Sequence, residues 1–254
     1  MCLLDEGEFL GVIPLPGRQE QTAKFLRSRI FFSDQVTVTD ASAGYSQVFV
    51  VGPQAQVILE SLGIQPPPLN HLSTAEIDDQ RVIVIAREIF AAVNYHLLLP
   101  PASLDFWLAA LSQRDAQPLD VETFEILRVE SGEPGTSAEL ISDYTPLEVG
   151  LQKMISGSKG CYTGQEIIAR QVTYDKITKH LVGLKVDERV RVGASILVDA
   201  KSVGTVTSVA QSPRFGHIAL GVVRRPHAEP GSNLVISSAS GASIPARVAD
   251  LPFA

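Results

Sequence analysis

From His180 to the end of the chain, short β-type segments alternate with turns, and this pattern limits the possible folds more than any other feature. Turn-forming residues stand at Arg191–Gly193, Gln211–Pro213 and Glu229–Gly231, and no helical period interrupts the pattern. Strands at such even spacing, without helices between them, predict a small antiparallel β-barrel over residues 181–254. The predicted strands are Leu181–Val186, Ser195–Val198, Val203–Ala210, His217–Val223, Leu234–Ser237 and Ile244–Val248.

Residues 1–120 combine strand and helix patterns and predict an α+β module. Helices interleaved with paired strands favour a sandwich of the split βαβ kind. Ser103 is of a residue type that caps helices, so a helix is expected from it through Leu111. The other predicted helices are Gly17–Phe32 and Gly52–Leu62, and the predicted strands are Gly7–Leu15, Val36–Thr39, Gln47–Val51, Arg81–Ile85 and Ala91–Leu99.

Residues 121–180 read as a connecting segment between these two parts. Helices are expected at Val121–Val129 and Gln165–Gln171, where apolar residues recur at helical spacing. Thr145-Pro-Leu-Glu has the residue types that open a short helix, and Ser156-Gly-Ser-Lys-Gly predicts a tight loop.

The charge of the chain limits its partners. With 21 basic and 28 acidic residues the net charge is −7, which argues against broad binding to nucleic acid or to an anionic membrane. Between Lys159 and Lys185, however, five basic residues outnumber two acidic ones. This segment is either a solvated face or a site for a small anion.

The predicted compartment is the cytoplasm. No apolar run reaches the roughly 20 residues of a membrane helix, and the acidic N-terminal residues differ from a basic leader. The two cysteines, Cys2 and Cys161, make no disulfide framework, which fits a reducing environment.

Several kinds of site are excluded by the sequence. It holds no phosphate loop, no dinucleotide-binding glycine pattern and no zinc-protease pattern. The five histidines lack the spacing of metal ligands, and each is expected at the surface or in a loop. Two cysteines cannot supply the four thiolates that usually hold an iron–sulfur cluster, so no metal site is predicted.

One octapeptide is the main candidate for a functional motif: Lys159-Gly-Cys-Tyr-Thr-Gly-Gln-Glu166. Glycines bracket a Cys-Tyr pair and permit a strained or closely approached backbone. Cys161 precedes a predicted helix and stands two residues after Lys159, and both positive fields favour the thiolate. An accessible thiol with a pKa below its ordinary value is one expectation, and a buried structural cysteine is the alternative.

The octapeptide resembles the signature of the YgfZ family, the folate-binding relatives of the glycine-cleavage T-protein (aminomethyltransferase). T-proteins proper lack this cysteine. The resemblance covers residues 120–254 strongly and residues 1–120 in their pattern only. The segments that resemble consecutive family blocks are Arg128-Val-Glu-Ser-Gly, Thr145-Pro-Leu-Glu-Val-Gly-Leu, Ile167-Ile-Ala-Arg170, Leu181-Val-Gly-Leu, Val203-Gly-Thr-Val-Thr-Ser, Ser212-Pro and Ile218-Ala-Leu-Gly.

This resemblance implies a T-protein-like α+β fold with split βαβ modules and a C-terminal antiparallel β-barrel. It divides the chain into a folate-binding module at 1–120, a connecting segment at 121–180 and a barrel domain at 181–254. The chain begins near what resembles the second family block, Gly7-Glu-Phe-Leu, so the N-terminal block is expected to be missing. The aspartate that serves T-protein catalysis belongs to that block, and no residue here matches it.

The resemblance also implies roles for single residues. Glu130 matches the T-protein acid that contacts the pterin ring, a role that a carboxylate can fill by accepting two ring N–H bonds. Lys159 falls close to an arginine that faces the folate tail, and a lysine there can meet a carboxylate, although not bidentately. Cys161 matches the cysteine of the YgfZ branch and is the candidate catalytic residue. The further candidate cofactor-binding residues are Tyr162, Gln165 and Arg170.

The implied function is that of an accessory protein that binds tetrahydrofolate or a one-carbon derivative. It would support assembly or repair of iron–sulfur clusters, and thereby cluster-dependent enzymes such as tRNA-thiolating ones. Its expected partners are iron–sulfur client or assembly proteins, with no direct nucleic acid and no membrane. A folate-dependent aminomethyltransferase of the glycine cleavage system is the alternative, and a binding module without folate is a third.

Overall fold

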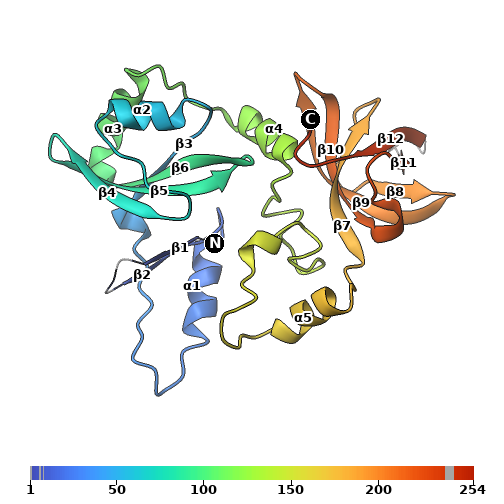
Figure 1. Cartoon of the computed structure of the whole chain (residues 1–254), viewed down its shortest axis with the longest axis horizontal. Coiled ribbons are helices and arrows are strands. Elements are labelled where there is room, and N and C mark those ends of the chain that lie inside the picture. Colours follow the sequence, from blue (N-terminus) through green and yellow to red (C-terminus); the bar gives the residue numbers. More distant parts are fainter. Residues whose placement is uncertain (1, 6, 8, 238–242) are drawn as a thin grey trace. The chain divides into compact units, whose positions relative to one another are not determined.

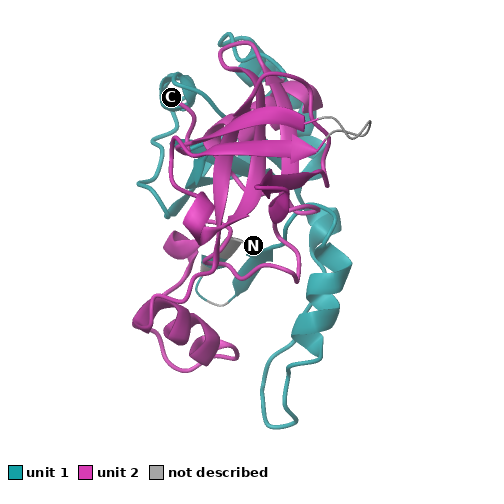
Figure 2. Cartoon of the chain, turned by 90° about the vertical axis from the view of Figure 1, so that its right-hand side faces the viewer, with its two compact units in different colours: residues 1–118 teal, residues 119–254 magenta. Residues whose placement is uncertain are grey.

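The computed structural model describes residues 2–5, 7, 9–237 and 243–254 of the chain (Figure 1). The chain divides into two compact units, residues 1–118 and residues 119–254, which Figure 2 shows in different colours. Within the described residues, no helix has both the length and the apolar character that crossing a bilayer requires.

Unit 1 is built on a four-stranded antiparallel sheet. Its strands β3 (Ser46–Val50), β4 (Leu72–Ile77), β5 (Gln80–Ile89) and β6 (Ala92–Leu99) lie in the order β3-β6-β5-β4. The strands β1 (Cys2–Asp5) and β2 (Leu10–Ile13) form a separate two-stranded sheet. The helices of this unit are α1 (Gln19–Arg27), α2 (Ala55–Ser61) and α3 (Leu104–Ser112), and short 3-10 turns lie at Ser42–Gly44 and Pro101–Ser103.

The core of unit 1 follows from the continuous apolar run of β5. Alternate side chains of a strand point to opposite faces, so a strand buried on both faces needs no polar alternation. Val82, Val84 and Ala86 pack in the cluster that contains the single tryptophan, Trp107. Ile83 and Ile85 pack on the other face with Leu4 and Leu98.

Unit 2 consists of helical and loop segments followed by a closed barrel. The helices are α4 (Val121–Ser131) and α5 (Gln165–Thr173), with a 3-10 turn at Gln152–Met154 between them. Six antiparallel strands close in the order β10-β7-β12-β11-β8-β9. They are β7 (Lys179–Val186), β8 (Ser195–Val198), β9 (Lys201–Ser212), β10 (Gly216–Arg224), β11 (Asn233–Ser237) and β12 (Ser243–Ala249), and a 3-10 turn at Arg225–His227 follows β10.

The expected α+β class with a C-terminal antiparallel barrel is confirmed, and each predicted barrel strand is found. In the sheet of unit 1, α2 joins the edge strands β3 and β4, which run antiparallel. A split βαβ module joins parallel strands instead, so this sheet departs from that expected detail.

Other local expectations are wrong. Val36–Thr39 is not a strand, because a β-prone run becomes one only where a neighbouring strand pairs with it. The edge strand β4 was not predicted, because polar residues alternate with apolar ones along it and no continuous apolar run marks it. Thr145–Glu148 lies in a turn that ends at Gly150 with φ 79°, so it opens no helix, and the 3-10 turn at Gln152–Met154 begins only after that glycine. Ser103 does precede α3, but its hydroxyl donates to Gln80 Oε1 at 2.7 Å and caps no backbone N–H.

The histidine expectation also fails at one position. His96 lies in the middle of β6 and is fully buried, stacked on Phe49 with 4.2 Å between ring centroids. Its neighbours along β6 are buried apolar residues, so the strand carries the imidazole into the interior.

The barrel depends on one glycine where two strands approach closely. A Cβ atom at Gly204 would lie 2.5 Å from the carbonyl oxygen of Val222 and 3.0 Å from Cα of Val223. Both are backbone atoms, so Gly204→Ala is expected to lower the free energy of unfolding by about 1–3 kcal/mol through overpacking. Chemical unfolding, monitored by circular dichroism, measures this change in the free energy of unfolding. Gly157→Ala is the matched control because no atom lies within 4 Å of its Cβ position, and an equal effect in both variants would contradict the packing argument.

Candidate functional site

The octapeptide forms an exposed loop that ends at the start of α5. Gly164 stands at the N-cap with φ 90°, a backbone conformation that favours glycine, so this position needs its glycine for a conformational reason. Gly160 has ordinary backbone angles and open space at its Cβ position. The loop is tied to the helix because the backbone N–H of Tyr162 donates to Gln165 Oε1 at 3.3 Å, and Gln165 N–H donates to the Tyr162 carbonyl at 3.2 Å.

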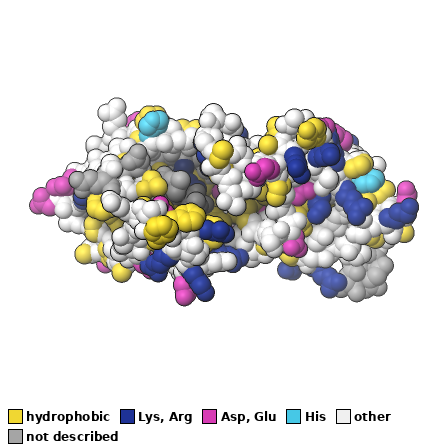
Figure 3. Space-filling model, turned by 90° about the horizontal axis from the view of Figure 1, so that it is seen from below, with side chains coloured by type: hydrophobic (Ala, Val, Ile, Leu, Met, Phe, Trp, Pro, Cys, Tyr) yellow, Lys and Arg dark blue, Asp and Glu magenta, His cyan; other side chains and the backbone are white. Residues whose placement is uncertain are grey.

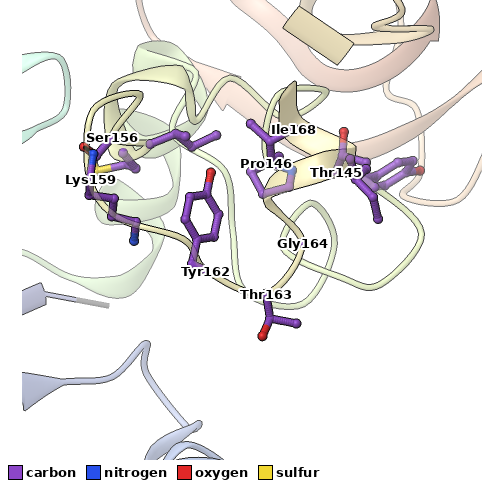
Figure 4. Close-up of a pocket in the computed structure, with 12 residues that line it drawn as sticks. Thr145, Pro146, Ser156, Lys159, Tyr162, Thr163, Gly164 and Ile168 are labelled. Atoms are coloured by element: carbon purple, nitrogen blue, oxygen red, sulfur yellow. Dashed lines mark hydrogen bonds between the residues drawn. The ribbon is translucent and has the colours of Figure 1, made fainter. Parts of the chain in front are cut away.

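A cavity of about 390 Å³ opens beside this loop, and we call it the aromatic cavity (Figure 4). Its walls are mainly apolar and aromatic, with a lysine and a few hydroxyl groups at the edge. Its volume lies within the range of small-molecule sites. The lining residues are Tyr144, Thr145, Pro146, Met154, Ile155, Ser156, Lys159, Tyr162, Thr163, Gly164, Ile167 and Ile168.

Lys159 and Tyr162 form the charged end of the aromatic cavity. The ammonium of Lys159 lies 4.4 Å from the centroid of the Tyr162 ring, a cation–π arrangement. Figure 4 shows both side chains on one side of the cavity, with Pro146 and Ile168 on the other. The Lys159 ammonium remains exposed and can also bind an anionic group of a ligand.

The opposite wall is fixed by Glu148, which is buried. Its Oε2 accepts a hydrogen bond from Thr145 N–H at 3.0 Å, and its Oε1 accepts one from the Thr178 hydroxyl at 2.9 Å. Gln171 of α5 donates its Nε2 to Thr145 Oγ1 at 3.1 Å. These hydrogen bonds therefore hold together three segments: the turn at Thr145, the end of α5 and the residue just before β7.

Tyr144 completes this wall. Burial, and to a lesser extent three neighbouring carboxylates, raises the pKa of Tyr144. Its hydroxyl, protonated at neutral pH like that of any tyrosine, can donate a hydrogen bond.

The structure separates the predicted site residues into three groups. Lys159 and Tyr162 line the aromatic cavity, and Gln165 holds the loop beside it. Cys161 and Arg170 are exposed and do not line it. Among the described residues, no hydrogen bond or ring contact holds either side chain. Cys161 is a free thiol on the surface, so the alternative of a buried structural cysteine does not hold.

Glu130 belongs to a different cluster, in the interior of unit 2. Its Oε1 accepts a 2.6 Å hydrogen bond from the Ser212 hydroxyl, and Ser212 Oγ in turn accepts from the N–H groups of Arg214 and Phe215. The carboxylate thus supports the β9–β10 hairpin. Its predicted contact with a pterin ring stays a prediction.

Sequence reasoning missed most of the cavity wall. Tyr144, Pro146, Met154 and Ile155 were not singled out, although the pattern Thr145-Pro-Leu-Glu marked the turn that positions two of them. Within the described part of the chain, no group of three or more His, Cys, Asp and Glu residues is placed to hold a metal ion. The cavity is suited to bind a flat aromatic ring system that carries an anionic group.

Family models match nearly the whole chain. Residues 1–159 match the GCVT N-terminal domain, and residues 179–254 match the glycine cleavage T-protein C-terminal barrel domain.

Relatives with similar sequences support the same family. The chain is 29% identical over 243 residues to a chloroplastic protein of Arabidopsis thaliana that carries a provisional transferase name, covering 94% of this chain and 55% of that protein. It is 32% identical over 232 residues to an aminomethyltransferase of Saccharopolyspora erythraea, covering 84% and 61%. The chain therefore spans little more than half the length of these relatives.

A solved structure shows the same fold. The crystal structure of the glycine cleavage system aminomethyltransferase T from Bartonella henselae superimposes with a TM-score of 0.74 at 20% identity. The superposition covers 94% of this chain and 66% of that one. At this identity the likeness concerns the fold alone.

Proposed function

The chain belongs to the glycine cleavage T-protein family, and we propose that it binds a reduced folate, tetrahydrofolate or a one-carbon derivative, in the aromatic cavity. The observation that carries the proposal is the apolar, aromatic cavity of about 390 Å³ with Lys159 at its edge. A folate combines flat rings with carboxylates, so the walls can receive a ring while the lysine meets an anionic group.

In this proposal the chain's own residues bind and orient the ligand. Tyr162 and Tyr144 contact the ring, and Ile167 and Ile168 exclude water from its face. Lys159 contributes a charge-assisted hydrogen bond to an anionic group. A bound tetrahydrofolate would supply one-carbon chemistry through its N5 and N10 nitrogens.

Lys159→Met is expected to weaken binding of tetrahydrofolate about tenfold, because one charge-assisted hydrogen bond contributes about 1.5 kcal/mol. Isothermal titration calorimetry with tetrahydrofolate and folinic acid measures the dissociation constants. Lys201→Gln is the control, since Lys201 is an exposed lysine of β9 that does not line the cavity. The absence of heat and of any thermal shift at millimolar folate would refute the proposed function.

Glu130→Gln separates the two roles of that residue. If Glu130 contacts the pterin, the ring does not lie in the aromatic cavity, which Glu130 does not line, and the variant weakens folate binding in addition to lowering the stability through the Ser212 bond. If it serves only the β9–β10 hairpin, the stability falls and the affinity of the folded protein does not change.

The narrower YgfZ assignment rests on the Lys159–Glu166 octapeptide. We propose on that basis an accessory role in iron–sulfur cluster assembly or repair, with client or assembly proteins as partners. The surface position of the Cys161 thiol supports it, since a partner, a cluster or an oxidant can reach the sulfur without rearrangement of the chain. The cytoplasmic location predicted from the sequence stays a prediction.

Cys161→Ala is expected to keep the fold and folate binding and to abolish rescue of cluster-enzyme activity in cells that lack the endogenous protein. The side chain is exposed and belongs to none of the hydrophobic clusters of the described residues, so its removal changes no core. Circular dichroism and folate titration check the first half, and the activity of a cluster-dependent enzyme checks the second. Cys2→Ser is the control, and equal rescue by Cys161→Ala would overturn the role of the thiol.

Aminomethyl transfer is the second candidate, because relatives that match the chain carry the name aminomethyltransferase. Reconstitution with the other proteins of a glycine cleavage system tests it. Folate-dependent turnover that survives Cys161→Ala would favour this candidate over the accessory role.

A further inference from the structure

Met154 lies in the wall of the aromatic cavity and, among the described residues that line it, is the one that carries sulfur. It ends the 3-10 turn Gln152–Met154, in which no residue is buried. The backbone N–H of Met154 donates to the Leu151 carbonyl at 3.0 Å, and the N–H of Ile155 donates to the Gln152 carbonyl at 3.2 Å. These bonds fix the backbone that carries the thioether at the cavity.

The side chain of Met154 is open to solvent, with 70% of the residue's surface exposed. A small polar oxidant can therefore reach the sulfur without any opening of the fold. Exposure alone does not set Met154 apart, because Figure 3 shows other hydrophobic side chains at the surface among Lys and Arg side chains. What distinguishes Met154 is the combination of an accessible sulfur with a place in the cavity wall.

The other sulfur atoms of the chain do not share this combination. The sequence contains two methionines and two cysteines, and Met1 lies outside the described residues. Cys161 is exposed, but it does not line the aromatic cavity. Oxidation of Cys161 therefore alters the surface of the loop, whereas oxidation of Met154 alters the cavity wall itself.

Oxidation of Met154 makes part of an apolar wall polar. The thioether becomes a sulfoxide, which is polar and whose oxygen accepts hydrogen bonds. Ile155, Ile167 and Ile168 present apolar groups to the same cavity and offer that oxygen no side-chain donor. A ring that lies against this wall must strip water from the sulfoxide without replacing its hydrogen bonds, which costs binding free energy.

We propose that Met154 is a modification site for peroxides, and that its oxidation to the sulfoxide weakens binding of the folate in the aromatic cavity. The inference rests on the proposed function and adds its regulation. The sulfur lone pair attacks one oxygen of hydrogen peroxide, so that an S–O bond forms and the O–O bond breaks. The second oxygen takes the proton of the first and leaves as water, and two electrons pass from sulfur to peroxide. A dithiol-dependent methionine sulfoxide reductase reverses the change, with two thiols oxidised to a disulfide and the oxygen released as water.

The test measures binding of folinic acid by calorimetry before and after treatment with hydrogen peroxide, which catalase then removes. The parent protein carries Cys2→Ser and Cys161→Ala, so that no thiol reacts, and peptide mass spectrometry follows the oxygen added to Met154. We expect the dissociation constant to rise at least about fivefold on oxidation. Methionine sulfoxide reductases for both sulfoxide epimers restore the original value. Folinic acid present during the treatment slows oxidation of Met154, because the bound ring covers the sulfur.

Met154→Leu in the same parent is the matched variant, because leucine is apolar and of similar volume but has no sulfur. Its dissociation constant is expected to be the same before and after peroxide, whereas that of the parent rises. Met154→Gln places a polar group in the wall without oxidation. It is expected to bind folinic acid more weakly than Met154→Leu, and peroxide weakens it no further. Met1 is present in all three proteins, so its oxidation affects them equally.

The outcomes separate this inference from the proposed function. An unchanged dissociation constant after oxidation of Met154, or an equal loss of affinity in Met154→Leu, overturns the inference and leaves the proposed function standing. A Met154 that reacts with peroxide in urea but not in the folded protein overturns it as well. If folinic acid does not bind before treatment, the proposed function fails. Anilinonaphthalene sulfonate, which joins aromatic rings to one anionic group, then probes the cavity: its fluorescence must fall when the parent is oxidised and must not fall in Met154→Leu, or the inference fails too.

Discussion

Arg128→Met is expected to lower the free energy of unfolding of unit 2 by about 3–5 kcal/mol, because it leaves a buried carboxylate without its cation. Glu139 is fully buried, and its Oε2 lies 3.8 Å from Arg128 Nη1. Ser208 links the pair, since Arg128 Nη2 donates to its oxygen at 2.9 Å and its hydroxyl donates to Glu139 Oε1 at 2.7 Å. Arg128 also donates to the carbonyl of Glu133 at 2.8 Å.

Hydrogen exchange of α4 and β9 in increasing urea measures this loss within unit 2. The matched control is Glu125→Gln, which removes the other carboxylate partner of the same arginine, 2.8 Å away but half exposed. Its expected cost is under about 1 kcal/mol, because solvent screens that pair. Equal losses in the two variants would show that the buried carboxylate does not depend on the guanidinium.

The stability of unit 1 is expected to fall by about 3 kcal/mol between pH 6.5 and pH 4, because of His96. Burial, and to a lesser extent the charge of Arg87, lowers the pKa of His96 from 6.5 to about 4. Its Nε2 bonds Gln47 Oε1 at 3.0 Å, whereas its buried Nδ1 has no partner among the described residues. A proton on Nδ1 would therefore place a charge in an apolar interior.

The direction of this change in stability follows from how many protons the folded and unfolded states bind. At pH 7 the imidazole is neutral in both states, so the full stability is present. Between pH 6.5 and pH 4 the unfolded chain takes up a proton that the folded chain does not, and the stability falls by up to about 1.4 kcal/mol per pH unit. Below pH 4 both states are protonated, and the contribution of this residue levels off.

Urea unfolding at several pH values, followed by the fluorescence of Trp107, measures this effect in unit 1. His96→Leu and His96→Gln are expected to show a shallower slope between pH 6.5 and pH 4 than the parent chain. His71→Gln, which removes an exposed histidine of the same unit, keeps the parent slope. The same slope in all four proteins would contradict the assignment to His96.

The candidate site was predictable from the sequence only in part. The octapeptide marked the loop because its glycines and the following helix pattern are local features, and Gly164 does take the left-handed conformation. The opposite wall could not be predicted, since Tyr144 and Pro146 reach the cavity through hydrogen bonds of Glu148 to Thr145 and Thr178. The bond to Thr145 is local, three positions along the chain, but the bond to Thr178 spans 30 positions, and no spacing rule relates those two residues.

The strands of the barrel and the loop before α5 could be located from the sequence alone, because apolar segments bounded by turn formers are local features, and each predicted barrel strand is present. Local turns also account for the hairpin pairs β8–β9, β9–β10 and β11–β12, whereas the pairs β7–β10, β7–β12 and β8–β11 that close the barrel join strands far apart in the chain. The partners of the buried polar groups likewise depend on the folded arrangement. Glu130 bonds Ser212, and Glu139 bonds Ser208, across 82 and 69 positions of the chain. A buried carboxylate must find donors wherever the packed chain supplies them, and burial is a property of the assembled fold.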